Sequence, residues 1–493
     1  HAMEFAYDLL ENQATSTRAR GIVEKSRTII VPVVNVDGFQ ISRSAAPLGN
    51  FSTFDYEMKR KNCTISAFTP LAYVSGACDN NLAGRLRGTD PNRNYPGFWG
   101  GPGASTSWSS DTYRGDAPGD TPEVDNIKRL ISERQVTNLI SNHTYSNLVL
   151  RPPSLLSTGF SPDEPRYKAL GATMTDTNDY LNWASFQLYD TSGSVEDWSY
   201  WQTGGFGFTF EIGPDSFHPA YQSGVVAEYL GLAPAAGAGQ GGNREAYYRM
   251  AEATIDPSFH STITGTAPED RVLTVSKQFQ AMTSPVIRPG GVVSDAIPYE
   301  NDLSSSLRTT GGKFSWAVNP STRPEVVGRY GRDPQGPVQA TQLLTNPDGV
   351  PAEGDSELAT FTVEGLPTAD NGAAEVRVAW PDGAVDWDVY VYDDTGRQVA
   401  SAASLADPEV AVLIDPLPGT YTVRVENYEG GATSDWSGEV VFKAPKPATY
   451  TGVKEAWTMT CATLAGDVVA SRSVVVDRGA RVDVGNACKK GKD

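Results

Sequence analysis

Three side chains, His1, Glu4 and His143, have the types and spacing of a hydrolytic zinc site. His1 and Glu4 form an H-x-x-E pair in a segment that is predicted to be helical over residues 1–13, and residues three apart share one helical face. His143, in SNHTYS, follows a strand-like run, and ligands gather at the strand ends of open α/β sheets. Two imidazoles and one carboxylate leave a fourth zinc position open for water. Each of these residues alone is more often an ordinary polar side chain, so the hypothesis depends on the rest of the chain.

The elements that must position these residues follow from the hydrophobic pattern of the first half of the chain. Helical and extended patterns alternate there, with helices expected at 1–13 and 122–133 and strands at 28–36, 136–141 and 206–212. Such alternation is typical of an α/β fold with a mostly parallel or mixed sheet. We therefore predict an α/β catalytic domain at residues 1–262, built on a mixed sheet that helices flank.

The second half of the chain has a different hydrophobic pattern. Short alternating runs such as EVRVAW and TYTVRVEN, separated by Gly, Pro, Asn and Asp, are typical of antiparallel β-sandwiches. A Pro-, Gly- and acid-rich linker near 346–356 divides this part of the chain. We predict a β-rich module of unknown role at 263–345, a β-sandwich at 357–448, and a small disulfide-closed β segment at 449–493.

The bulk composition argues against two classes of function. A formal net charge of −19 disfavours nucleic-acid binding, because phosphates would be repelled. No run of about 18 apolar residues is present that would span a membrane. The four cysteines form two sequence-local pairs without C-x-x-C spacing, Cys63 with Cys78 and Cys461 with Cys488. Two disulfides in an oxidising compartment are the simplest account, and the composition fits an exported bacterial protein.

Seven sequence blocks stand in one order along residues 1–260: HAME, PVVNVDGF, GTDPNRNYPGFWGGPGAS, SDTYRGDAPGDTPEVDNI, SNHTYSNLVLRPP, YDTSGSVEDWSYW and FTFEIG. Their content and order resemble those of the zinc carboxypeptidase family, the metallocarboxypeptidases called funnelins. The resemblance implies that His1, Glu4 and His143 hold one Zn²⁺, and that Glu211 is the general base for zinc-bound water. Zinc lowers the pKa of bound water towards about 7, and a carboxylate accepts its proton and passes it to the leaving amine.

The resemblance also implies roles in substrate binding. Asn92 and Arg93 match the pair that clamps the terminal carboxylate of the substrate, which suits a forked guanidinium, and Tyr189 matches the tyrosine that closes over it. Arg60, in KRKN, takes the position of the arginine that polarises the scissile carbonyl and stabilises the oxyanion. This last match is looser, because Cys63 stands where the family usually has a second arginine.

Glu196 takes the position that the family places at the base of the side-chain pocket. A carboxylate there is similar to members that remove C-terminal Lys or Arg, so we expect basic C-terminal residues to be accepted. The alternative is that Glu196 faces solvent or pairs with a nearby cation. His218 and His260 are expected to be structural, and a Cys63–Cys78 disulfide is expected to close an insertion on the substrate side.

Residues 357–445 resemble the bacterial pre-peptidase C-terminal domain, a β-sandwich of secreted peptidases, through AVDWDVYVYDDTGRQVASA and PLPGTYTVRVENYEG. Its role stays open between binding of a polymer or cell surface and assistance in export. A weak candidate Ca²⁺ site is formed by four acidic residues near strand ends, although such residues are more often simply solvated. These are Asp386, Asp388, Asp393 and Asp394.

We therefore predict a secreted, zinc-dependent metallocarboxypeptidase that acts on the C-termini of peptides or proteins. Two alternatives remain: a relative that acts on cell-wall peptides or as a deacylase, and a non-catalytic binding protein on the same scaffold. Asn92, Arg93 and Tyr189 favour a substrate with a free α-carboxylate, and the presence of Glu211 disfavours the non-catalytic reading. Because the family has more of its sheet before the first zinc histidine, we expect more catalytic fold and a signal peptide upstream of His1. We also expect weak zinc binding by the chain as given.

Overall fold

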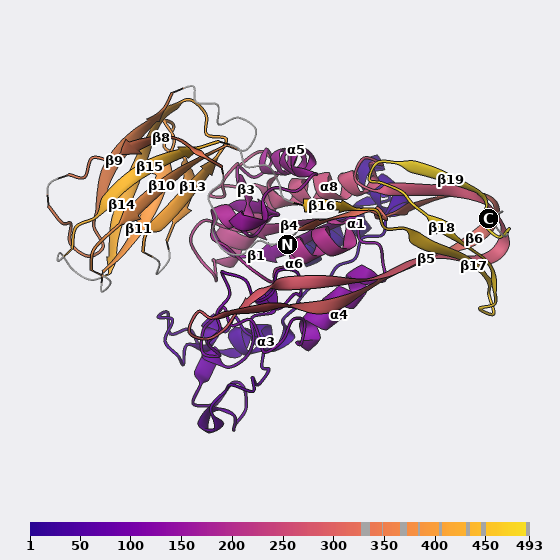
Figure 1. The fold of residues 1–493 in the computed structure, drawn as a ribbon, viewed down its shortest axis with the longest axis horizontal. Helices are drawn as coiled ribbons and strands as arrows, with labels where there is room; N and C mark the ends of the chain where they lie inside the picture. Colours follow the sequence, from indigo (N-terminus) through magenta and orange to yellow (C-terminus); the bar gives the residue numbers. More distant parts are fainter. Residues whose placement is uncertain are drawn as a thin grey trace.

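The computed structural model describes residues 1–326, 336–347, 349–364, 372–382, 385–403, 407–429, 434–444 and 450–489. The gaps fall within the predicted units 263–345, 357–448 and 449–493 and, at residue 348, within the predicted linker. Figure 1 shows an N-terminal α/β region, a β-sandwich beside it, and a long β-ribbon that joins a C-terminal sheet. This arrangement confirms the predicted fold class, an α/β domain followed by all-β modules. In the part of the chain that is described, no helix has both the length and the apolar character needed to cross a bilayer.

A four-stranded mixed sheet forms the centre of the α/β region, in the order β1-β4-β2-β3. β4 is parallel to β1 and antiparallel to β2, while β3 is parallel to β2. The strands are β1 (Asn138–His143), β2 (Leu148–Arg151), β3 (Leu181–Ala184) and β4 (Phe206–Glu211). The helices are α1 (Ala2–Asn12), α2 (Thr17–Lys25), α3 (Val36–Ser44), α4 (Pro122–Ser132), α5 (Glu164–Thr175), α6 (Val195–Trp198), α7 (Ala227–Leu230) and α8 (Gly242–Ile255).

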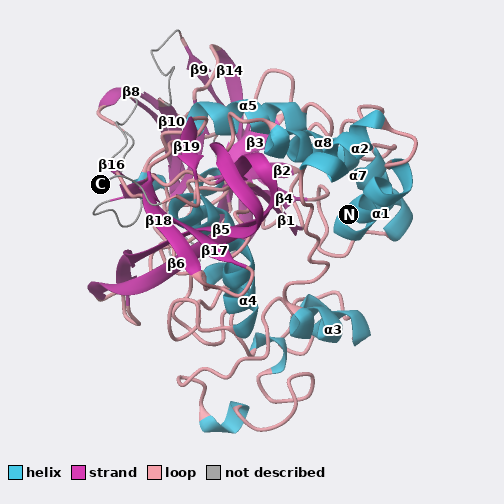
Figure 2. Ribbon diagram, turned by 90° about the vertical axis from the view of Figure 1, so that its right-hand side faces the viewer, coloured by secondary structure: helices cyan, strands magenta, loops and turns pink. Residues whose placement is uncertain are grey.

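The two faces of this sheet are covered by different helices. Phe206, Phe208 and Phe210 alternate along β4 and pack with residues of α1, α2, α5, α7 and α8. On the other face, Leu139 of β1 packs against α4 and α6. Figure 2 shows α1, α5, α7 and α8 together on one side of the sheet, with α4 on the other. The sheet therefore separates α1 from the residues of β1 and β4 that face α4 and α6.

Most of the local predictions for this region are confirmed, and one is wrong. The helices expected at 1–13 and 122–133 are α1 and α4, and the strands expected at 136–141 and 206–212 are β1 and β4. The strand expected at 28–36 does not form, since this segment is irregular up to α3 and exposes Ile29, Val31 and Val34. No described strand lies beside it to complete a ladder. Asn35 instead caps α3, because its side-chain oxygen accepts the backbone N–H of Gly38 at 3.0 Å.

The predicted sandwich consists of two antiparallel sheets that enclose one apolar core. The sheet orders are β13-β10-β15-β8 and β12-β11-β14-β9. The strands are β8 (Val338–Leu343), β9 (Ser356–Val363), β10 (Ala373–Ala379), β11 (Asp386–Tyr392), β12 (Gln398–Ala402), β13 (Glu409–Ile414), β14 (Gly419–Glu429) and β15 (Ser437–Lys443). Because β8 pairs with β15, the sandwich begins before the predicted linker at 346–356.

A long ribbon of two strands, β5 (Ser261–Ile287) and β6 (Val293–Val318), joins the last described residues in one sheet. The remaining strands are β7 (Arg323–Val326), β16 (Tyr450–Val453), β17 (Trp457–Thr463), β18 (Val468–Val474) and β19 (Arg481–Asn486). β5 pairs with β17 and β19, and β7 pairs with β16. The segments predicted as separate units at 263–345 and 449–493 thus share a sheet, and the sandwich lies between them in sequence.

One contact between the C-terminal sheet and the α/β region is made by Arg478, which lies between β18 and β19 and is largely covered. Arg478 donates to the carboxylate of Asp163 at 2.9 Å and to the backbone carbonyls of Phe259 and Gly204. Its guanidinium lies 4.6 Å from the ring centroid of Phe206 in β4. The two predicted disulfides are confirmed, and Cys461–Cys488 closes the end of this sheet.

Candidate active site

The candidate site begins where β1 and β4 end, with His143 opposite Glu211 in parallel register. Directly paired residues of neighbouring strands share one face of a sheet, and here the Nδ1 of His143 lies 3.7 Å from a carboxylate oxygen of Glu211. The other ring nitrogen of His143 lies 3.0 Å from the hydroxyl of Ser141, two residues earlier on the same face. Two groups that sequence analysis linked only by resemblance are therefore neighbours.

The surroundings shift the pKa values of both groups. Burial raises the pKa of Glu211 to about 7, against the opposing charges of Arg60 and Arg93. Burial, assisted by Arg60, lowers the pKa of His143 to about 4. A neutral imidazole retains the lone pair that a metal ligand needs. A carboxylic acid with a pKa near neutrality can both accept and release a proton at physiological pH.

Arg60 and Arg93 meet at a buried carboxylate that sequence analysis did not single out. Asp90 accepts a hydrogen bond from the Nε of Arg60 at 2.8 Å and lies 3.9 Å from the guanidinium of Arg93. Burial opposes its ionisation, but the two arginines outweigh burial and hold the pKa of Asp90 below its ordinary value. Asp90 thus ties the two cations near Glu211 to one point. Its position in the run DPNRN was the available signal.

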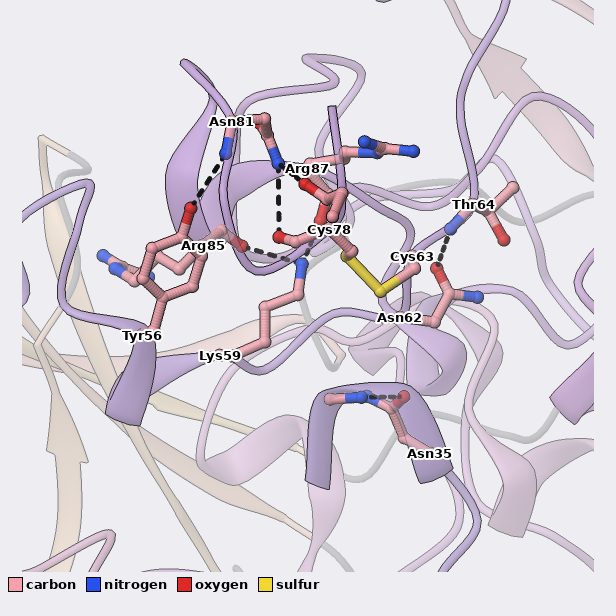
Figure 3. Close-up of a disulfide and its surroundings, with 12 residues drawn as sticks. Asn35, Tyr56, Lys59, Asn62, Cys63, Thr64, Cys78, Asn81, Arg85 and Arg87 are labelled. Atoms are coloured by element: carbon pink, nitrogen blue, oxygen red, sulfur yellow. Dashed lines mark hydrogen bonds between the residues drawn. A yellow bond between two sulfur atoms is a disulfide. The ribbon is translucent and has the colours of Figure 1, made fainter. Parts of the chain in front are cut away.

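Arg60 is held from both sides by buried lysines. Lys59 donates to the backbone carbonyls of Arg85 and Arg87, and Lys61 donates to those of Trp108 and Ser110, both at 2.8 Å. Figure 3 shows Lys59 beside the Cys63–Cys78 disulfide, which closes the expected insertion. Burial lowers the pKa of each lysine to about 7. The hydrogen bonds of Lys59 and Lys61 therefore fix the backbone on both sides of Arg60.

The predicted carboxylate clamp is built on a short turn. Asp90 caps this turn by accepting the backbone N–H of Asn92 at 3.0 Å, and the side-chain oxygen of Asn92 accepts the N–H of Val195 at 3.1 Å. Arg93 is almost fully buried and donates through Nε to the backbone carbonyl of Gly103 at 3.0 Å. Tyr189 is exposed, and its ring centroid lies 5.9 Å from the guanidinium carbon of Arg93.

Glu196 is buried on α6, below the sheet face that carries Glu211. One oxygen accepts hydrogen bonds from the hydroxyls of Ser154 and Ser185, at 3.2 and 3.3 Å, and the other has no hydrogen-bond partner among the described residues. Gly207 of β4 permits this approach, because a Cβ there would lie 2.7 Å from the Cα of Glu196. The alternative in which Glu196 faces solvent is therefore wrong, because the side chain is buried. Burial, followed by the charge of Glu196, raises the pKa of the adjacent Asp197 to about 8.

His1 and Glu4 stand apart from this cluster. The Nε2 of His1 lies 2.8 Å from the carbonyl of Val225, its ring lies 5.3 Å from that of Tyr229, and Glu4 is exposed on α1. Tyr247, which packs near His1, donates to Asn142 on the sheet face opposite to His143. Within the described ranges, no three His, Cys, Asp or Glu side chains are close enough together to hold a metal ion.

The donor atoms of α1 nevertheless suit a metal. A carbonyl accepts only from a protonated ring nitrogen, so the bond to Val225 places the proton of a neutral His1 on Nε2. Its Nδ1 then carries the lone pair, and this atom is buried without a partner among the described residues. Imidazole nitrogen and carboxylate oxygen are ordinary zinc ligands. The donor atoms of His1, Glu4 and His143 are of types that bind zinc, but the three side chains do not converge on one point.

The remaining predicted residues lie outside the cluster. His218 is near Ser42 and Glu57, with its ring nitrogens 3.4 and 3.9 Å from them. His260 is buried near the junction with β5. None of the four acidic residues proposed for Ca²⁺ belongs to a metal-binding group among the described residues, and Asp393 accepts from Thr395 and Arg397 in a turn.

Comparisons with known proteins bear on the N-terminal region. The profile of the zinc carboxypeptidase family matches residues 1–228. Carboxypeptidase A1 of Mus musculus is 35% identical over 133 residues, which are 25% of this chain and 32% of that protein. Metallocarboxypeptidase A of Trichophyton tonsurans is 30% identical over 169 residues, 34% of each chain. The chain thus spans about a third of the length of these curated relatives.

Solved structures are matched more loosely. Thrombin activatable fibrinolysis inhibitor has a TM-score of 0.38 and 23% identity, over 52% of this chain and 60% of that one. Carboxypeptidase A of Helicoverpa armigera has a TM-score of 0.34 and 18% identity, over 46% and 49% of the two chains.

Proposed function

The profile of the zinc carboxypeptidase family matches residues 1–228, and from this premise we propose that the chain is a metallocarboxypeptidase that hydrolyses C-terminal residues from peptides or proteins. The observation that carries the proposal is the cluster at the ends of β1 and β4. There a carboxylic acid with a pKa raised to about 7 lies beside a histidine and within the influence of two arginines. Peptide hydrolysis needs a group that moves a proton and cations that stabilise negative charge.

We propose that His1, Glu4 and His143 hold one Zn²⁺, because their donor types suit it; in this structure α1 packs on the other face of the sheet, and the three side chains are not gathered around one point. The free Nδ1 lone pair of His1 and the neutral His143 support this assignment. When bound, zinc would supply an acidified water and a Lewis acid for the scissile carbonyl. Glu211 would accept the proton of that water and return it to the leaving amine, since its raised pKa suits both transfers.

The cations have separate roles in this proposal. Arg60, aligned by Asp90, is exposed enough to face the scissile carbonyl and the oxyanion that forms from it. Arg93 would hold the terminal carboxylate together with Asn92, and Tyr189 would close over it. The Nε of Arg93 donates to the carbonyl of Gly103, and its Nη1 donates to the carbonyl of Asn92 at 2.9 Å. We therefore assign Nη2 to the contact with the substrate carboxylate.

For specificity, we propose that Glu196 favours basic C-terminal residues. Its second oxygen is buried and has no hydrogen-bond partner among the described residues, so a guanidinium or ammonium group that entered the site would find an unpaired acceptor there. The competing role is structural, because Ser154 and Ser185 already bind the first oxygen. Turnover of hippuryl-Arg and hippuryl-Phe by wild type and Glu196→Gln separates the two. A selective loss of the Arg activity, of about tenfold, supports the proposal, whereas equal changes on both substrates support the structural role.

The overall function is tested by hydrolysis of a blocked dipeptide with and without phenanthroline. We expect activity that the chelator abolishes, that added zinc restores, and that Glu211→Ala removes. Activity that survives both treatments would exclude the zinc mechanism. Binding of such peptides without cleavage would favour the non-catalytic alternative. Cleavage only of cell-wall peptides or N-acyl groups would favour a relative that acts on cell-wall peptides or as a deacylase.

We also propose that the protein acts outside the cell, because Cys63–Cys78 and Cys461–Cys488 favour an oxidising compartment. Binding of a polymer or of Ca²⁺ by the sandwich stays a prediction. Secretion of the full chain with both disulfides intact, detected by thiol labelling of the medium fraction, is the corresponding measurement.

A further inference from the structure

Several β5 residues near the far end of the β5–β6 ribbon are buried, although the ribbon extends there beyond the C-terminal sheet. Figure 1 shows the ribbon leaving that sheet and passing along α4 into the α/β region. Thr283, Ser284 and Val286 are almost fully buried, yet none belongs to the apolar core that β5 forms with β17 and β18. Something other than the ribbon's own sheet must cover them, and this neighbour is the loop at residues 97–103.

The ribbon and the loop are joined through backbone and side chains. The N–H of Ile287 donates to the carbonyl of Gly100 at 2.9 Å, and Arg114 donates both to that carbonyl, at 3.1 Å, and to the carbonyl of Ile287. Val286 lies directly over Gly100, because a Cβ on this glycine would be 3.0 Å from a methyl group of Val286. A Cβ on Gly101 would likewise lie 3.0 Å from the hydroxyl of Ser284.

The opposite side of the same loop holds Arg93. The carbonyl of Gly103 accepts the Nε of Arg93 at 3.0 Å, and Ser192 donates to the carbonyls of Gly101 and Pro102. The loop has no regular secondary structure, and glycines occupy four of its seven positions, so its own backbone resists distortion weakly. An external support is therefore needed to keep the carbonyl of Gly103 where it orients the guanidinium.

We propose that the end of the β5–β6 ribbon, residues 283–287, is a positioning element for Arg93. It holds the 97–103 loop from behind, and thereby sets the affinity of the site for the terminal carboxylate of the substrate. This inference rests on the proposed function and extends it: a module outside residues 1–228 becomes part of substrate binding. The ribbon touches neither substrate nor reacting atoms, so its effect is expected in binding and not in the proton transfers of Glu211.

The test compares Val286→Ala with Val293→Ala. Val293 is opposite Ile287 at the same ribbon end but is exposed, so the same two methyl groups are removed with no contact to the loop. In full-length protein with zinc added, we expect Val286→Ala to raise the KM for hippuryl-Arg and the inhibition constant of free L-arginine about tenfold, with kcat within about twofold. Val293→Ala should match wild type. Inhibition by acetohydroxamate, which has no terminal carboxylate, should change in neither variant.

Two further measurements keep the outcome decisive. Hydrogen exchange of the amides at 100–103 should quicken in Val286→Ala, and unchanged exchange would overturn the positioning role whatever the kinetics. Unchanged KM and inhibition constant, or equal changes in Val286→Ala and Val293→Ala, would overturn it as well. If Val286→Ala does not fold, Ser284→Val, which presses on Gly101, replaces it with the same expectations.

Failure of the proposed function gives a separate pattern. A wild type that cleaves no blocked dipeptide contradicts the function. Calorimetric titration with L-arginine then decides the inference: weaker binding in Val286→Ala supports it, and equal binding or no binding to any form overturns it.

Discussion

The two halves of the candidate site differ in how they are held. His143 and Glu211 are fixed by the parallel register of β1 and β4, and Arg60 and Arg93 are fixed by a shared buried carboxylate and by backbone carbonyls. His1 and Glu4 stand on α1, which packs through Phe5 and Leu9 on the other face of the sheet. Groups on paired strands are positioned by the ladder itself, whereas groups on a surface helix depend on what the helix packs against.

For the half of the site that contains His143 and Glu211, the largest effect is expected from Glu211→Gln. The amide cannot accept the proton of the attacking water, so we expect kcat/KM to fall by about 1000-fold. Thermal melting should change little, because the side chain is partly buried and its size is kept. Glu133→Gln, at an exposed position after α4, is the control. Turnover in Glu211→Gln within tenfold of wild type would remove Glu211 from the reaction.

The α1 half is tested through zinc affinity. If His1, Glu4 and His143 are ligands, Glu4→Gln and His143→Ala should each weaken zinc binding by more than the 10- to 100-fold typical of outer-shell partners, roughly 1000-fold. A chelating dye measures this by competition. Glu11→Gln, exposed on the same helix, serves as the matched control. Wild-type zinc affinity in Glu4→Gln, with loss in His143→Ala, would mean that α1 contributes no ligand.

Substitution of Arg93 by lysine tests whether the oriented guanidinium of Arg93 binds the terminal carboxylate of the substrate. Lysine keeps the charge but loses both the bond to Gly103 and the forked geometry, so we expect the KM for hippuryl-Arg to rise about 30-fold with a small change in kcat. Steady-state kinetics beside Arg129→Lys, an exposed change on α4, provide the measurement. A KM equal to that of wild type would show that the terminal carboxylate is bound elsewhere.

The smallest expected effect is on stability, through the lysines that flank Arg60. Burial lowers the pKa of Lys59 and of Lys61 to about 7, from 10.5 in the unfolded chain. Between these values the unfolded chain binds more protons, so the free energy of unfolding rises with pH from about 7 to about 10. Denaturant titrations should show a shallower rise in Lys59→Met than in wild type. The same slope in both would contradict the lowered pKa of Lys59.

Sequence reasoning succeeded where one local pattern decides the structure. The amphipathic segment of α1, the proline-initiated α4 and the apolar β4 formed as expected, and both disulfides join cysteines that are close in sequence. The neighbours His143 and Glu211 were named through family resemblance, and the strand register explains why they meet. Their roles and the zinc ligands stay predictions.

It failed where the outcome depends on distant partners. The run at 28–36 has strong β-propensity, but a strand needs a neighbouring strand to complete its hydrogen bonds. Its end instead caps a helix, because Asn35 is the N-cap residue of α3. The pairing of β5 with β17 and β19 joins segments that lie about 180 to 220 residues apart in the sequence, which no local pattern reveals. Asp90 was missed for a related reason, because its importance comes from two arginines that approach it only in the folded chain.

Arg478 has a consequence for the order of events during synthesis. Its guanidinium fills a buried place against Phe206 and Asp163, inside the α/β region that the ribosome completes more than 200 residues earlier. The sheet that carries this arginine also needs β19, which pairs with the first residues of β5. The contacts of Arg478 with Phe206 and Asp163 therefore form only after β18 and β19 have emerged. The proposed peptidase activity should accordingly appear only after residue 486 has been synthesised and has left the ribosomal tunnel.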